Sequence, residues 1–76
     1  MICYVKDYKE GWLIMKLQVW DSNKLKYETP EEKIDGNFEG AEQIAKMKCF
    51  INLYRKLGIE SAEEIINLIP TYDMEN

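Results

Sequence analysis

The stretch from Trp12 to Trp20 alternates between two sets of side chains, and this alternation constrains the fold more than any other feature. In an extended chain, one side would carry Leu13, Met15, Leu17 and Val19, and the other Trp12, Ile14, Lys16, Gln18 and Trp20. A period of two residues is typical of a β-strand that packs one face against a core. The sequence therefore predicts a strand that carries apolar side chains on both faces.

Two further strands are predicted beside this one. Residues 2–7 are rich in β-forming side chains and precede a Lys9-Glu10-Gly11 turn. Asp21-Ser22-Asn23-Lys24 supplies a second turn, in which Asn23 tolerates a left-handed backbone. Leu25 and Tyr27 then alternate with charged residues. We predict a three-stranded antiparallel meander over residues 1–29.

The second half of the chain predicts helices. Thr29-Pro30-Glu31-Glu32 has the cap, the proline and the acid of a short helical start. Residues 30–38 are expected to form a linker. A long helix is expected over residues 38–57 and ends at Gly58. Ser61-Ala62-Glu63-Glu64 is a capping box that opens a short helix over residues 61–69, and residues 70–76 form a loose tail. We therefore expect one α+β domain over residues 1–76, with both helices on one sheet face.

The long helix contains large apolar residues at helical spacing. They are Ile44, Met47, Phe50, Ile51, Tyr54 and Leu57, with Leu53 beside them. Side chains spaced by three and four residues share one face of a helix. This stripe is expected to cover the sheet.

Catalysis has little support in the sequence. The chain has no histidine, the commonest general base. Ser22 lies in a predicted turn and Ser61 in a helix cap, and neither has a candidate base beside it in the sequence. Cys3 and Cys49 are distant thiols that cannot form a structural zinc site without unusual carboxylate help. We expect no enzyme activity, metal or cofactor, and two free thiols, with a disulfide as the alternative if Cys3 lies beside the long helix.

The expected location is the cytoplasm. Apolar runs such as residues 12–15 are far too short to span a membrane. Lys6 and Asp7 stand where a secretory signal would need its apolar stretch. We expect no membrane association.

A face of exposed aromatic residues is the first candidate binding feature. If Leu13 and its alternating partners meet the helices, the opposite face carries Trp12, Ile14 and Trp20. Tyr4 or Tyr8 is a candidate to join them from the first strand. Tryptophan and tyrosine are enriched in protein interfaces. We expect this face to bind a partner protein; burial by a second copy or within the chain itself are the alternatives.

Acidic residues form the second feature. The net charge is −4, and it is uneven: residues 1–27 hold five lysines and three acids, whereas residues 28–76 hold five bases and eleven acids. The candidate acidic contacts are Glu28, Glu31, Glu32, Asp35, Glu63 and Glu64. Such a surface is attracted to a basic partner and repelled by nucleic acid. The alternative is an ordinary solvated surface, with acids favoured at helix N-termini.

A basic stripe on the long helix is the third feature. It consists of Lys48, Asn52, Arg55 and Lys56. Residues 53–65 resemble the two helices and glycine turn of helix-turn-helix DNA-binding proteins. The segment that would be the recognition helix begins Ser61-Ala62-Glu63-Glu64 and contains no base. Nucleic acid is therefore not the expected partner, and the DNA-binding function of that family is not carried across to this chain.

These features together predict a non-enzymatic acidic protein-binding module. Nine lysines against one arginine suggest the coding bias of an AT-rich genome, such as those of low-GC bacteria and their phages. We expect a phage or mobile-element inhibitor of the anti-CRISPR or antitoxin type, which blocks a basic surface of a nucleic-acid-handling protein. The first alternative is a homodimeric nucleic-acid-binding regulator that uses the basic stripe, and the second is a structural subunit of a larger assembly.

Overall fold

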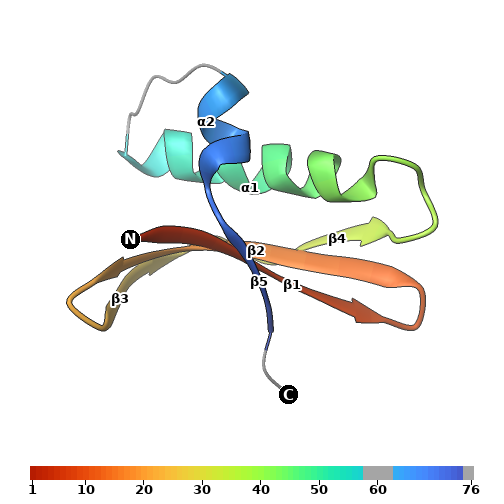
Figure 1. Cartoon of the computed structure of the whole chain (residues 1–76), viewed down its shortest axis with the longest axis horizontal. Coiled ribbons are helices and arrows are strands. Elements are labelled where there is room, and N and C mark those ends of the chain that lie inside the picture. The colour runs from red at the N-terminus through yellow and green to blue at the C-terminus, as the bar shows by residue number, and fades with distance from the viewer. Residues whose placement is uncertain (58–62, 75–76) are drawn as a thin grey trace.

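In the computed structural model, which describes residues 1–57 and 63–74, a five-stranded mixed sheet carries two helices on one face (Figure 1). The elements in chain order are β1 (Ile2–Lys9), β2 (Trp12–Asp21), β3 (Lys24–Glu28), β4 (Glu32–Asp35), α1 (Ala41–Leu57), α2 (Glu63–Leu68) and β5 (Thr71–Asp73). The predicted α+β class is confirmed, and so is the antiparallel β1–β2–β3 meander.

Both turns predicted between the strands of the meander form tight hairpin turns. Glu10 and Gly11 have φ angles of 53° and 84°, and Ser22 and Asn23 have φ angles of 49° and 68°. Two consecutive positive φ angles define the turn whose twist matches that of the flanking strands. The left-handed backbone expected at Asn23 is confirmed.

β2 is the central strand of the sheet. β1 pairs with one edge of β2, while β3 and β4 follow each other along the other edge. Thr29 lies between β3 and β4, where its N–H donates to the carbonyl of Leu17 at 2.9 Å. Its Oγ1 in turn accepts from the N–H of Leu17, also at 2.9 Å. Thr29 thus maintains the pairing where the edge strand is interrupted.

The helical start predicted at Thr29-Pro30-Glu31-Glu32 is wrong, because this segment leads into β4. The Thr29 hydroxyl accepts from a strand amide rather than from the first turn of a helix. Ile34 lies opposite Leu13 and packs against the core. Pairing along the first half of β2 thus prevails over the local helical signal.

The loose tail predicted for residues 70–76 is also wrong over its described part. β5 runs parallel to β1, with Thr71 opposite Tyr4 and Tyr72 opposite Val5. The N–H of Tyr4 donates to Pro70, and that of Met74 donates to Lys6, both at 2.8 Å. The free edge of β1 provides the partners that a short terminal segment lacks on its own.

The core lies between α1 and one face of the sheet. Tyr4, Leu13, Met15 and Leu17 are fully buried on the sheet side. They meet a row of residues spaced by four along α1, which consists of Ala41, Ala45, Cys49 and Leu53. We call this row the inner row of α1. Three of its four side chains, Ala41, Ala45 and Cys49, are small and let the helix approach a sheet face that large side chains already fill.

The predicted helix stripe is therefore wrong for three of its members. Met47, Ile51 and Tyr54 are 43%, 48% and 43% exposed, respectively, and lie on the side of α1 away from the inner row. Phe50 is buried. α1 begins at Ala41 rather than at residue 38, because Gly40 has a positive φ of 79°. Gly58 and the capping-box residues 61 and 62 lie outside the described residues.

The two cysteines occupy opposite faces of the sheet, and both are free and buried. Cys3 lies opposite Gln18 in the β1–β2 register, on the face away from the helices. The Cys49 thiol lies on the helix face and donates to the carbonyl of Met15 at 3.6 Å. Burial raises the pKa of the Cys49 thiol to about 11. The sheet thus separates the two thiols, which answers the question of pairing that the sequence left open.

We expect Thr29→Val to lower the free energy of unfolding by about 1–3 kcal/mol, because it leaves the buried Leu17 amide without an acceptor. Thr29→Ser retains the hydroxyl and should lose much less. Urea unfolding of the two variants checks this. Equal losses would show that packing of the threonine methyl, and not the hydrogen bond, accounts for the effect.

Candidate functional site

The face of the sheet away from the helices carries Trp12, Ile14 and Trp20, as the alternation of β2 predicts. We call this surface the open face. Trp12 is 43% exposed, and Ile14 and Trp20 are half-buried. The strand register adds Val5 and the half-exposed Tyr72 to the same face. The open face therefore carries apolar side chains from β2, β1 and β5, and the same register places the polar Lys16, Gln18 and Asp7 among them.

Tyr4 does not belong to the open face, contrary to the sequence prediction. It lies opposite Leu17 and is fully buried beneath the helices. Its hydroxyl donates to the carbonyl of Ile66 at 3.0 Å, which ties α2 to the sheet. Burial raises the pKa of this hydroxyl above its ordinary value. Tyr4 is thus a structural residue, because even-numbered positions of β1 share the helix side with odd-numbered positions of β2.

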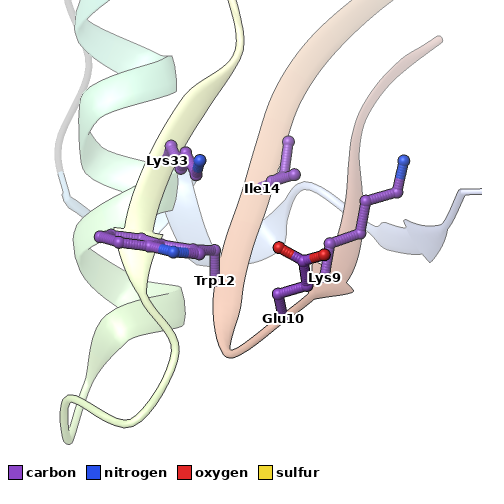
Figure 2. Close-up of a pocket in the computed structure, with 5 residues that line it drawn as sticks. All are labelled: Lys9, Glu10, Trp12, Ile14 and Lys33. Carbon is purple, nitrogen blue, oxygen red and sulfur yellow. The ribbon is translucent and has the colours of Figure 1, made fainter.

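A hollow of ≈350 Å³ lies at the end of the open face that carries Trp12. Figure 2 shows the Trp12 ring extending toward Lys33 of β4, with Ile14, Lys9 and Glu10 on the opposite side of the hollow. The Lys33 ammonium lies 4.9 Å from the centre of the Trp12 ring. A cation over an indole face is attracted by the ring quadrupole. This contact favours one orientation of Trp12, so one wall of the hollow exists before anything binds.

A second hollow, of ≈600 Å³, lies at the end of the open face that carries Trp20. Its lining includes Cys3, Val5, Lys16, Gln18, Trp20 and Tyr72. The Trp20 indole N–H donates to the Gln18 amide oxygen at 3.0 Å, and the Gln18 amide nitrogen donates to Glu28 at 2.6 Å. Glu28 also pairs with Lys16 at 3.2 Å. This network orients Trp20 from two neighbouring strands.

The Glu28 carboxylate is the charged centre of the network. The hydrogen bond from Gln18 lowers its pKa most, and Lys16 lowers it further, while partial burial opposes both. A carboxyl whose pKa is lowered in the folded state stabilises that state above its ordinary pKa and loses this effect as the pH falls through the lowered value. At neutral pH the Glu28 carboxylate is therefore ionised and keeps its contacts with Gln18 and Lys16.

The predicted acidic contacts occupy different environments. Glu28 is paired, and Glu32 accepts from the Asn52 amide at 3.2 Å. Glu31 and Asp35 are exposed at the ends of the β4 segment. Glu63 and Glu64 begin α2, but their side chains lie outside the described residues. The structure thus leaves Glu31 and Asp35 on the surface, and Asp35 lies opposite Trp12 in the register.

The predicted basic stripe does not form one continuous surface. Asn52 donates to Glu32 of β4, and the Lys56 ammonium lies 5.7 Å from the centre of the Tyr27 ring. Lys48 and Arg55 are exposed. The stripe is therefore divided between two residues that contact the sheet and two that face solvent.

Metal-ligand clusters and activated thiols are two common bases of catalysis, and the described residues provide neither. Within residues 1–57 and 63–74, no three acidic or cysteine side chains gather as they would around a metal ion. Burial raises the pKa of both thiols, which keeps them protonated at neutral pH. A protonated thiol is a poor nucleophile. No helix in the described part of the chain is both long enough and apolar enough to cross a membrane.

Sequence reasoning missed two contributors to the open face. Tyr72 belongs to a strand of three residues, which is too short to show an alternation. Lys33 approaches Trp12 through the β2–β4 pairing, which places residues far apart in the sequence side by side. A local pattern in the sequence carries no signal for either residue.

We expect the indole N–H resonance of Trp20 to shift only when the pH falls below the ordinary glutamate pKa of 4.5, because the pKa of Glu28 is lowered. Glu28→Gln should abolish this step, since its amide cannot titrate. An NMR pH titration checks both expectations, with Trp12 as the internal control. A step that survives in Glu28→Gln would show that another group controls the Trp20 environment.

Comparisons of this chain with family models, curated proteins and solved structures give no match. A functional interpretation therefore rests on the geometry of the chain itself.

Proposed function

We propose that this chain is a non-enzymatic protein-binding module that docks through its open face. The observation that carries the proposal is the placement of Trp12 and Trp20 at opposite ends of the open face, each beside a hollow. Tryptophan is the residue type most enriched among side chains that dominate binding energy. The contact of Trp12 with Lys33 and that of Trp20 with Gln18 already restrict the two indole side chains. Binding therefore costs less side-chain entropy.

A protein partner fits this surface better than a small ligand. The two hollows lie at separate ends of the face; Ile14 lines the one beside Trp12, and Val5 lines the one beside Trp20. Such a layout suits an extended surface that contacts both ends of the face at once. Aromatic anchors combined with polar contacts are typical of protein interfaces.

The charge of the chain favours a partner with a basic surface. The net charge is −4 at pH 7, and exposed Glu31, Asp35 and Glu39 lie at or just beyond β4. A net negative field raises the association rate of a basic partner, and salt screens this effect. A nucleic-acid-handling protein has such a surface, so inhibition of such a protein is the specific role that we propose.

Single-stranded nucleic acid is the alternative class of partner, because lysines accompany the aromatic residues of the open face. Aromatic rings with nearby cations form stacking platforms for bases. However, Lys16 is paired with Glu28, and Lys33 lies over the ring of Trp12. These contacts occupy two of the cations that phosphates would need, so protein is the favoured partner.

The double variant Trp12→Thr/Trp20→Thr should lose binding to the partner by at least about 30-fold, which is typical of removing one dominant aromatic anchor. Threonine suits a strand, so the fold should persist. Tyr8→Thr is the matched control, because it removes an aromatic side chain that is 54% exposed on the helix side of the sheet. The measurement is quantitative mass spectrometry of proteins retained from an extract of the native host.

The expected outcome is a protein that the wild type and Tyr8→Thr retain and the double variant does not. Its association should also slow as the salt concentration rises. Retention that is equal for all three chains would contradict the proposal. Retained material that nuclease removes would contradict it too and would favour the nucleic-acid alternative.

A further inference from the structure

A second apolar surface lies on the side of α1 away from the sheet. It consists of Ile44, Met47, Ile51 and Tyr54, and we call it the outer stripe. Ile44 is half-buried, and the other three are between 43% and 48% exposed. α1 already packs on the sheet through its inner row. A helix that covers a sheet normally presents polar residues outward, so the outer stripe is more than the fold itself requires.

The spacing of the outer stripe is that of a helix-pairing seam. Successive members lie three, four and three residues apart, which matches the first and fourth positions of two heptads. The seam from Ile44 to Tyr54 is about 15 Å long. A partner helix can pack against such a seam over about three turns.

One border of the seam carries positive charge, and the other carries none. Lys48 and Arg55 follow Met47 and Tyr54 directly and occupy equivalent heptad positions on one border. Both are exposed. The other border carries Gln43 and the buried Phe50. The acid of α1, Glu42, contacts Lys6 at 3.2 Å on the sheet side, so it does not offset this basic border.

These charges decide between a second copy and a different partner. In an antiparallel pair of copies, Lys48 and Arg55 of one helix would face the same residues of the other, and like charges repel. In a parallel pair they would face Gln43 and Phe50, which bring no negative charge. Neither arrangement of two α1 helices supplies an acid to the basic border.

We propose that the outer stripe binds an amphipathic helix of a partner protein, with apolar residues along its seam and acids along its border. This surface is separate from the open face, because the sheet and the core lie between them (Figure 1). The inference therefore stands or fails independently of the proposed function. The chain would contact two partners, or two parts of one partner, on opposite sides.

The probe for this test is a synthetic helical peptide of about three heptads with leucine at the seam and glutamate at both borders. The glutamates of two peptide molecules repel each other, so the peptide does not pair with itself and stays available for binding. The matched probe carries lysine in place of every glutamate. We expect the full chain to bind the glutamate peptide at least about tenfold more tightly than the lysine peptide.

The variant Lys48→Glu/Arg55→Glu should reverse this preference, because it inverts the charge of the border and leaves the seam intact. Ile51→Ser should weaken binding of the glutamate peptide without unfolding the chain, since Ile51 is 48% exposed. Affinities from isothermal titration are compared with amide chemical shifts, which should change along α1 and not on the open face.

Three outcomes would overturn the proposal. One is equal affinity for the two peptides, and another is shift changes confined to the open face. The third is a dimer of the free chain that sedimentation detects and Met47→Ser disrupts, which would assign the outer stripe to a second copy.

Discussion

The packing of the inner row of α1 against β2 determines the rest of the structure. Tyr4, Leu13, Met15 and Leu17 fill the helix side of the sheet with large side chains. The helix meets them with alanines and a cysteine, because close-packed layers combine large residues with small ones. This match fixes the rotation of α1 about its axis. The same rotation places Met47, Ile51 and Tyr54 on the surface, so the choice of core also creates the outer stripe.

Features that depend on neighbouring residues could be predicted from the sequence. The strand alternation, the left-handed backbone at Asn23 and the long helix are local properties, and each is confirmed. β4 and β5 could not be predicted, because both are strands only through pairing with residues that are distant in the sequence. The prediction of which face of α1 packs on the sheet was wrong for a different reason. α1 has apolar residues on two sides, and hydrophobicity alone favours the side with the larger residues.

The candidate site also combines features that the local sequence predicts with features that depend on strand pairing. Trp12, Ile14 and Trp20 share a face because of the strand period, which the sequence contains. The contacts that orient the two indoles depend on cross-strand register: Gln18 lies opposite Glu28, and Lys33 lies near Trp12. Register also explains why charge counts mislead. Glu28 pairs with Lys16 of β2, and Glu42 pairs with Lys6 of β1. Part of the negative charge counted in the sequence is therefore neutralised within the fold.

The two apolar surfaces have a common energetic consequence. A chain of 76 residues has a thin margin of stability, because small domains bury a modest share of their surface. This chain nevertheless leaves two indoles and the outer stripe partly in water. A partner that binds only the folded state adds its binding free energy to the free energy of unfolding. Apolar groups that contribute little to the isolated fold would then contribute most in the complex, which is the state in which both surfaces would be covered.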